Sequence, residues 1–151
     1  MMGMDHLMPD DHSITITDTP DPNDVQIIEN GLSAFNLQHA PPENYQRLVV
    51  VLRTADNRIV GGILGNTWWG WLRIDVLWVD EAVRGQDWGT RLMQAAEAEA
   101  IRRGCHHSFL DTMSFQALPF YLKMGYTVFG QLDDLPIGHS RYFLQKELSS
   151  L

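Results

Sequence analysis

The chain has 151 residues, of which 44% are apolar and 20% charged, which fits one globular domain with a full core. Its formal net charge is −8, from 11 Lys and Arg against 19 Asp and Glu. This balance argues against binding to nucleic acid or to an anionic membrane, because both need basic patches.

The first eleven residues, MMGMDHLMPDD, have no periodicity and predict a poorly ordered N-terminus over residues 1–11, ahead of a single domain over residues 12–151. They lack the basic region and the apolar run of a secretory signal, and no stretch of the chain approaches ~18 uninterrupted apolar residues. The single cysteine, Cys105, excludes an internal disulfide and a cysteine-cluster metal site. We therefore expect a cytoplasmic protein with no bound metal.

The first half of the chain predicts one strand, one helix and three further strands. Isoleucines alternate with Ser and Thr over residues 13–19, which is the period of a half-buried strand. Apolar side chains then recur at helical spacing from Val25 to Leu37, after the turn TPDPND and before the stop APPE. The three strands that follow are separated by polar turns, so we expect them to pair in antiparallel fashion. They cover residues 47–53, 59–65 and 71–79.

The second half changes period and predicts a helix from Thr90 to Arg103, which ends at a glycine. A strand over residues 107–112 would lie parallel to the preceding strand, because a helix crosses between them. A short helix with a proline in its first turn then leads to two last strands, over residues 126–132 and 141–148. The fold class is therefore α/β (α+β), with a mixed, mostly antiparallel central sheet of about six to seven strands and helices on both faces.

The stretch VRGQDWGTRL (83–92) has the form of a glycine loop that runs into a helix. Backbone N–H groups at a helix N-terminus attract anions, and the glycines let the backbone approach a ligand closely. The Gly-Lys-Ser/Thr ending of a Walker loop and the G-x-G-x-x-G of dinucleotide folds are both absent. The loop therefore predicts a phosphate site of another kind, although Asp87 places a carboxylate in its middle. We expect this carboxylate to turn away from the phosphate and cap the helix, with Arg84 or Arg91 offsetting its charge.

Two stretches resemble motifs of the GNAT superfamily of N-acetyltransferases. IDVLWVDEAVRGQDWGTRLM is similar to the acyl-CoA-binding motif, whose loop has the form Arg/Gln-x-x-Gly-x-Gly/Ala. Arg84 and Gly89 fill its first and last positions, and Asp87 stands where the family has its middle glycine. FQALPFYLKMGYTVFG looks like the closing helix and strand, with Tyr121 on the motif's tyrosine. The predicted order of elements over residues 13–148 also matches that fold.

The resemblance implies that an amine attacks the thioester of acetyl-CoA directly, in a ternary complex. The diphosphate would lie on the glycine loop, and backbone groups at the end of the strand over residues 71–79 would hold the pantetheine and stabilise the oxyanion. At residue 114 many relatives have an asparagine that contacts the cofactor, and the shorter serine of this chain puts that contact in doubt or makes it water-mediated. The implied cofactor-binding residues are Leu77, Trp78, Val79, Arg84, Gly85, Gln86, Asp87, Trp88, Gly89, Thr90, Ser114 and Tyr121.

The resemblance also assigns catalytic roles. Tyr121 is the candidate general acid, because a phenol of pKa ~10 can protonate a thiolate whose acid has a pKa of ~8.5 at a free-energy cost of about 2 kcal/mol. The attacking amine must lose a proton to a base or a water chain. Asp75 is the first candidate for that base, and Asp111 and His107 are the alternatives.

The resemblance implies that the acceptor is an amine of a small molecule or a peptide. Trp68, Trp69 and Trp71 could form an aromatic wall for a cationic amine, and the same aromatic turn offers a contact for a homodimer. Asp133 and Asp134 could help to attract such a cation. A catalytically silent acyl-CoA-binding or regulatory module on the same fold is the alternative function. A toxin-like relative that acetylates aminoacyl-tRNA is opposed by the net charge of −8.

Overall fold

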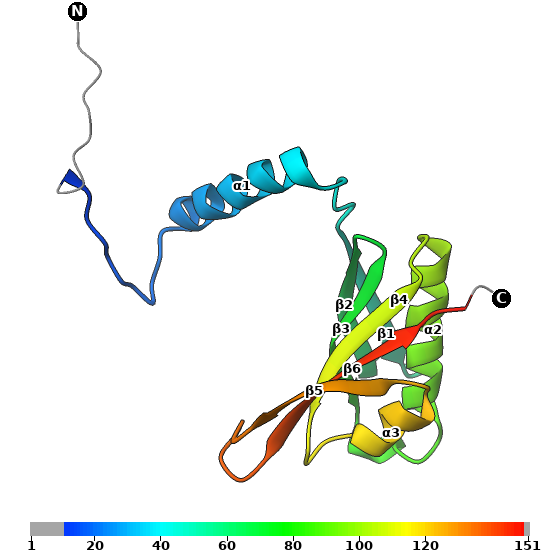
Figure 1. Ribbon diagram of the computed structural model, residues 1–151. Coiled ribbons are helices and arrows are strands. Elements are labelled where there is room, and N and C mark those ends of the chain that lie inside the picture. The colour runs from blue at the N-terminus through cyan, green and yellow to red at the C-terminus, as the bar shows by residue number, and fades with distance from the viewer. Residues whose placement is uncertain (1–10, 150–151) are drawn as a thin grey trace, which may run out of the picture. The chain divides into compact units, whose positions relative to one another are not determined.

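The structure is a computed structural model that describes residues 11–149 (Figure 1). The chain divides into two compact units, one ending at Pro41 and the other beginning at Pro42. The poorly ordered terminus expected over residues 1–11 lies, apart from Asp11, outside the described residues. The single domain over residues 12–151 stays a prediction.

The first unit contains helix α1 (Pro22–His39), which confirms the helix expected here. The side chain of Asp21 accepts a hydrogen bond from the backbone N–H of Asn23 and caps the helix, and Pro22 occupies its first turn. The strand expected over residues 13–19 is wrong, because this segment carries no strand. Alternating isoleucines indicate which face of a strand would be buried, but a strand also needs a neighbouring strand, and no described residue pairs with this segment.

The second unit contains a six-stranded sheet in the order β1-β2-β3-β4-β6-β5. All pairs are antiparallel except the central pair of β3 and β4, so the mixed, mostly antiparallel sheet is confirmed. Among residues 11–149, no helix is long and apolar enough to cross a membrane. The elements are β1 (Gln46–Arg53), β2 (Ile59–Trp68), β3 (Trp71–Val79), α2 (Trp88–Arg102), β4 (His107–Met113), α3 (Leu118–Lys123), β5 (Thr127–Asp133) and β6 (Ser140–Glu147).

The elements of this unit lie close to the expected ranges, with small differences at their ends. The β2 strand runs three residues beyond the expected end at residue 65, because the turn to β3 consists of Trp69 and Gly70 alone. Both residues have positive φ, at 47° and 76°, which is the conformation that two-residue hairpin turns favour. Helix α2 begins two residues before the expected Thr90, since the first turn already includes the end of the glycine loop.

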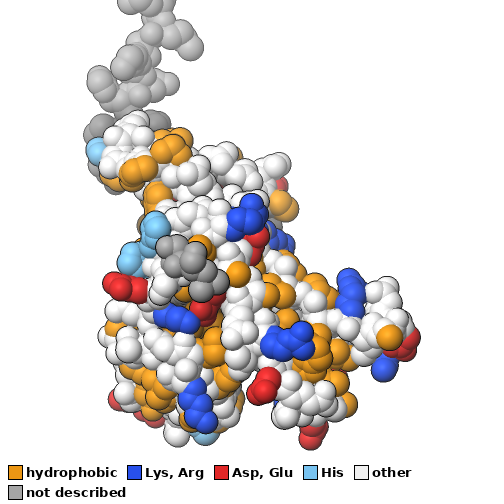
Figure 2. Space-filling model, turned by 90° about the vertical axis from the view of Figure 1, so that its right-hand side faces the viewer, with side chains coloured by type: hydrophobic (Ala, Val, Ile, Leu, Met, Phe, Trp, Pro, Cys, Tyr) orange, Lys and Arg blue, Asp and Glu red, His pale blue; other side chains and the backbone are white. Residues whose placement is uncertain are grey.

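The core of this unit lies between one face of the sheet and helices α2 and α3, which are on the same side of it (Figure 1). Helices were expected on both faces, but within this unit they cover one face. Alternate residues of β4 are buried and partly exposed, as expected for a strand with one face on the core. On the face of the described residues that Figure 2 shows, Lys and Arg side chains stand apart from one another and form no continuous basic surface. The buried apolar side chains are Leu48, Ile63, Leu72, Ile74, Leu92, Met93, Ala96, Ala100, Cys105, Leu110, Tyr121, Tyr126, Leu144 and Leu148.

The two central strands pair over only part of their length. Parallel pairing of β3 with β4 ends at Ile74 and Leu110, after which β4 continues beside β6 alone. On its other side β3 stays paired with β2 as far as Val79, with a bulge at Asp75, which has no partner on β2. The two central strands therefore part, and one edge of β3 from Asp75 to Val79 has no neighbouring strand.

Gly65 makes this bulge sterically feasible. A Cβ atom at this position would overlap the carbonyl oxygen of Arg73 on the neighbouring strand. We therefore expect Gly65→Ala to lower the free energy of unfolding by about 3 kcal/mol, because the strands would have to separate to admit the methyl group. Urea unfolding followed by circular dichroism measures this change.

The matched control is Gly31→Ala in α1, where an added Cβ meets no atom within 4 Å. This substitution should raise helix stability by up to about 1 kcal/mol, because alanine favours a helix over glycine. Equal unfolding midpoints for Gly65→Ala and the unmodified protein would show that the close approach at the bulge is not required.

Candidate functional site

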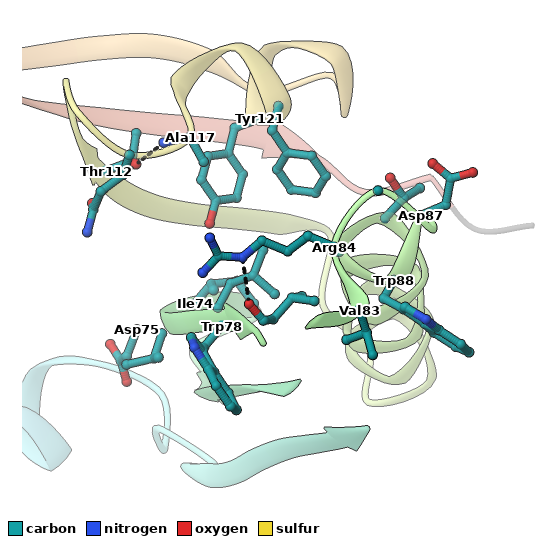
Figure 3. Close-up of a pocket in the computed structure, with 18 of the residues that line it drawn as sticks. Ile74, Asp75, Trp78, Val83, Arg84, Asp87, Trp88, Thr112, Ala117 and Tyr121 are labelled. Atoms are coloured by element: carbon teal, nitrogen blue, oxygen red, sulfur yellow. Dashed lines mark hydrogen bonds between the residues drawn. The ribbon is translucent and has the colours of Figure 1, made fainter. Parts of the chain in front are cut away.

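A cavity of about 780 Å³ lies where β3 and β4 part, beside the start of α2 and one side of α3. This volume falls in the range usual for small-molecule sites, ~300–1,000 Å³. Figure 3 shows Tyr121 directed into the cavity from α3, with residues of β3 on the opposite side. The lining residues are Ile74, Asp75, Val76, Leu77, Trp78, Val79, Val83, Arg84, Gly85, Asp87, Trp88, Gly89, Thr90, Asp111, Thr112, Phe115, Gln116, Ala117, Phe120 and Tyr121.

The glycine loop leaves the N-terminus of α2 open toward the cavity. The first backbone N–H groups of any α-helix have no acceptor within it, and here they belong to Trp88, Gly89 and Thr90. Asp87 occupies the N-cap position with φ 63° and ψ 17°, and its side chain makes no capping hydrogen bond. All three N–H groups belong to residues that line the cavity, so the helix end can offer donors to an anion there.

The expectation that the Asp87 side chain caps α2 is therefore wrong. A capping side chain reaches the helix N–H groups from an extended backbone, whereas Asp87 has the left-handed conformation. This conformation also accounts for the glycine that the family places here, since Asp tolerates positive φ better than most residues but less well than glycine. Figure 3 shows the carboxylate pointing away from Arg84 and Tyr121. That it turns away from a bound phosphate stays a prediction.

The two arginines of the loop make other contacts. The Nε of Arg84 donates a hydrogen bond to the carbonyl oxygen of Val79 at 2.9 Å, which ties the loop to the end of β3. The guanidinium of Arg91 lies 4.3 Å from the ring centroid of Trp88. Neither forms an ion pair with Asp87 in the part of the chain that the structure describes. Neither arginine therefore offsets the charge of Asp87 through a direct contact.

Tyr121 is the most deeply buried ionisable side chain of the cavity. It is only 6% exposed, and its ring packs edge-on against Phe120 and Tyr126. Burial, with a smaller contribution from the charge of Asp111, raises the pKa of Tyr121 to about 12. The phenol is therefore protonated across the physiological pH range and can donate a hydrogen bond into the cavity.

The three candidate bases are placed differently. Asp75, at the bulge of β3, lines the cavity and forms an ion pair with Arg73 at 2.8 Å. Asp111, on β4, also lines it, and its Oδ1 accepts a hydrogen bond from Arg141 Nε at 2.9 Å and forms an ion pair with a terminal guanidinium nitrogen of Arg141 at 2.8 Å. His107 stacks on Trp71 with ring centroids 4.6 Å apart and does not line the cavity. The structure thus brings both aspartates to the site but not the histidine.

Two of the expected cofactor-binding residues, Gln86 and Ser114, do not line the cavity. Ser114 instead joins the end of β4 to the β5–β6 hairpin. Its backbone N–H donates to the carbonyl oxygen of Ser140 at 2.7 Å, and its hydroxyl accepts from the N–H of Ser140 at 3.0 Å. Gln116 lines the cavity nearby, and its Oε1 accepts from the N–H of Met113 at 2.8 Å.

Sequence reasoning missed several lining residues between the end of β4 and α3. Thr112, Phe115, Gln116, Ala117 and Phe120 all line the cavity. The sequence did contain a signal for these residues, because four of them belong to the stretch FQALPFY, which carries the resemblance to the family. Only its tyrosine was assigned a role.

The residues considered for binding an amine lie away from this cavity. Trp68 and Trp69 line a second cavity at the other end of α2, and the ring of Trp71 contacts His107 and Phe109. In the β5–β6 hairpin, Asp133 accepts from Ser140 and Asp134 from the N–H of Gly138. An acceptor bound beside Tyr121 would therefore meet Asp75 and Asp111 before any of these groups.

The comparisons with known proteins agree with this architecture. Residues 13–126 match the acetyltransferase (GNAT) family. Acetyltransferase Atu2258 of Agrobacterium fabrum is 36% identical over 134 residues, which are 89% of this chain and 98% of that protein. Blasticidin-S acetyltransferase of Streptomyces morookaense is 42% identical over 91 residues, which are 60% of this chain and 67% of that protein. The crystal structure of an acetyltransferase from Bacillus cereus superposes with a TM-score of 0.80 at 32% identity, covering 89% of this chain and 98% of that one.

Asp87 should weaken the binding of an anion at the start of α2 through its charge alone. We expect Asp87→Asn to lower the Kd for CoA about two- to fivefold, because a carboxylate near the helix N-terminus no longer repels the diphosphate. Asparagine also tolerates positive φ, so the free energy of unfolding should fall by no more than about 1 kcal/mol, the contribution of a carboxylate at a helix N-terminus. Calorimetric titration with CoA and urea unfolding measure the two quantities.

Two further variants separate charge from backbone conformation. Asp87→Ala also removes the charge, but alanine in the left-handed conformation should lower the free energy of unfolding by about 1 kcal/mol. Glu81→Gln removes an exposed carboxylate that does not line the cavity, so it should leave the Kd for CoA unchanged. If Glu81→Gln and Asp87→Asn lowered the Kd for CoA equally, the effect would come from the net charge of the protein and not from the position of Asp87 in the loop.

Proposed function

We propose that this chain, which belongs to the GNAT acetyltransferase family, is an N-acetyltransferase that transfers the acetyl group of acetyl-CoA to a primary amine. The observation that carries the proposal is the cavity between the parted strands, with open helix donors at one end and the Tyr121 phenol facing it. The chain's cysteine, Cys105, is buried and forms no disulfide, which suits a reducing compartment. We therefore place the activity in the cytoplasm.

The cavity has the donors that acetyl-CoA requires along its length. The N–H groups of Trp88, Gly89 and Thr90 would receive the diphosphate at the start of α2. The free edge of β3 from Leu77 to Val79 would pair with the amides of the pantetheine arm, in the place of the strand that β3 lacks there. The carbonyl oxygen of Val79 is the exception, because it already accepts from Arg84. One N–H of this edge would then stabilise the oxyanion that develops on the acetyl carbonyl.

The reaction forms a bond between the amine nitrogen and the acetyl carbon and breaks the bond between that carbon and sulfur. The proton that the amine loses passes to a base, for which Asp75 is the first candidate because it lines the cavity. The thiolate that leaves takes the proton of the Tyr121 phenol. With a pKa of about 12 for Tyr121 and ~8.5 for a thiol, this transfer costs about 5 kcal/mol. That is well below the barrier of about 16 kcal/mol for a turnover of ~10 s⁻¹, so the acid role is energetically feasible.

The acceptor is an amine of a small molecule or a peptide. The relative from Streptomyces morookaense is named for acetylation of blasticidin S and shares 42% identity over 91 residues, which supports a small-molecule acceptor. The net charge of −8 favours a cationic or neutral acceptor over a nucleic acid.

The test is a screen for acetyl-CoA turnover with free thiol as the readout. Polyamines, amino acids, aminoglycosides, short peptides and blasticidin S are offered separately as acceptors, and thiol release above the acceptor-free rate identifies an enzyme. Binding of CoA without thiol release from any acceptor would favour the catalytically silent module. Absence of a CoA-dependent rise in melting temperature at millimolar CoA would remove the cofactor assignment itself.

Removal of the Tyr121 hydroxyl tests the acid role. We expect Tyr121→Phe to lower kcat about 100-fold with a KM for acetyl-CoA within threefold, because general acids contribute ~10²–10⁴-fold to rates. Steady-state kinetics on an acceptor from the screen measures both constants. The control is Tyr142→Phe, which removes a hydroxyl from a tyrosine that packs on the same core without lining the cavity. Full turnover by Tyr121→Phe would remove the acid assignment.

The pH dependence of kcat/KM follows from the raised pKa of Tyr121. Because the phenol stays protonated until the pH nears 12, activity should rise as the acceptor amine loses its proton and should not fall again below about pH 10.5. A pH series from 6 to 10.5 measures this profile. A falling limb near pH 10 in the unmodified protein that is missing in Tyr121→Phe would mean that the phenol titrates at its ordinary pKa.

A further inference from the structure

A buried polar cluster lies outside the cavity and joins four elements of the fold. It consists of Glu97 from α2, Ser108 from β4, Tyr126 from the turn after α3, and Lys146 from β6, and we call it the Glu97 cluster. Glu97 is 9% exposed, Tyr126 1% and Ser108 0%. None of the four lines the cavity, so the proposed reaction does not use them directly.

The hydrogen bonds of the Glu97 cluster fix a single arrangement. Lys146 Nζ donates to one carboxylate oxygen of Glu97 at 2.6 Å, and the Tyr126 hydroxyl donates to the other at 3.2 Å. Because the phenol has one proton, the hydroxyl of Ser108 must donate to the Tyr126 oxygen, 2.9 Å away. Burial and the charge of Glu97 raise the pKa of Tyr126 above its ordinary value, so this donor stays protonated.

Tyr126 connects this cluster to Tyr121. Its backbone N–H donates to the carbonyl oxygen of Tyr121 at 3.0 Å, and the two rings pack edge to face with centroids 6.1 Å apart. Gly125, between α3 and Tyr126, has φ 94°, and the side chain of Lys146 lies beside it. The Glu97 cluster therefore contacts two residues that follow α3, through Lys146 beside Gly125 and through the hydrogen bonds of the Tyr126 hydroxyl.

Helix α3 depends on such contacts for its position. It has six residues, and helices of this length are not stable by themselves in water. At its other end, the backbone N–H of Ala117 donates to Thr112 at a longer distance of 3.4 Å. A displacement of ~1 Å at a catalytic group can lower a rate about 100-fold, so the position of α3 determines how well Tyr121 can act.

We propose that Glu97 and Tyr126 are positioning residues, whose hydrogen bond holds α3 on α2 and thereby fixes the Tyr121 hydroxyl in the cavity. Replacement of a buried ion pair by apolar side chains is often neutral or stabilising, so stability alone does not account for the pair of Glu97 and Lys146, whose side chains are 12% and 22% exposed. The importance of the fixed position for catalysis rests on the acid role of Tyr121 proposed above.

The first test needs no acceptor. Tyr126→Phe removes one hydroxyl and leaves the pair of Glu97 and Lys146 intact. Amide hydrogen exchange should then become at least about tenfold faster in Leu118–Lys123 and stay unchanged in α2, whereas the control Tyr142→Phe should change neither. Unchanged exchange in α3 would overturn the proposal.

The second test uses turnover and a double-mutant cycle. Tyr126→Phe should lower kcat about tenfold with the Kd for CoA within twofold, and it should have no further effect in a protein that already carries Tyr121→Phe. An additive loss in the double variant would mean that Tyr126 does not act through Tyr121. Full turnover of Tyr121→Phe would contradict the acid role of Tyr121 and not the positioning role of the Glu97 cluster. Hydrogen exchange would still decide whether the Glu97 cluster holds α3.

A third variant separates position from stability. The double substitution Glu97→Leu with Lys146→Met replaces the ion pair by apolar side chains of similar size, and the Tyr126 hydroxyl can then donate to Ser108 instead of Glu97. One buried hydrogen bond is lost, so the melting temperature should fall by only a few degrees. Its kcat should nevertheless fall about tenfold, as for Tyr126→Phe. A stable double variant with full turnover would overturn the role of Glu97.

Discussion

The site depends on the separation of β3 from β4. The two strands run parallel only from Trp71 to Ile74, and the bulge at Asp75 turns β3 away while β4 continues beside β6. Backbone groups in a sheet normally satisfy one another, so the backbone groups on a strand edge without a neighbour are available to a bound ligand. The pairing of β3 with β2 continues to Val79 and holds the free edge rigid. Every other part of the cavity, from the helix donors to the Tyr121 phenol, is arranged around this gap.

The proposed cofactor is an anion and the chain is acidic, but the donors proposed to hold the cofactor are backbone groups. The net charge of −8 opposes an anion at long range, but salt screens charges that lie more than ~10 Å apart. The N–H groups at the start of α2 act at hydrogen-bond distance and are fixed by the helix. Arg84 supports this arrangement as a brace, since its Nε is engaged with the carbonyl oxygen of Val79. The loop thus depends on its geometry more than on its charge.

The sequence predicted the regular parts of the site better than the side-chain contacts. Helical and strand periods located β3, α2 and β4 to within two residues, because each of these elements buries one face in a continuous core. The capping role of Asp87 was predicted wrongly because capping depends on the backbone angle φ of the residue. The identity of a residue gives little information about φ unless the residue is glycine or proline. The same limit applies to Ser114, whose hydrogen bonds to Ser140 depend on the packing of a hairpin 26 residues away. The strand expected over residues 13–19 had the right period but no partner to pair with.

The environment of Tyr121 determines when it can act as an acid. Burial is the larger cause of its raised pKa, and the nearby charge of Asp111, which forms an ion pair with Arg141, adds to it. A phenol of pKa about 12 is a poor acid toward a thiolate in water, where the thiol has a pKa of ~8.5. A thiolate that forms inside the same cavity is desolvated as well, which raises the pKa of its own thiol and narrows the difference. In the proposed reaction, the proton transfer would therefore be least costly when the pantetheine arm fills the gap between β3 and β4 and excludes water. The separation of the strands would then contribute to the proposed acid chemistry as well as to the proposed binding.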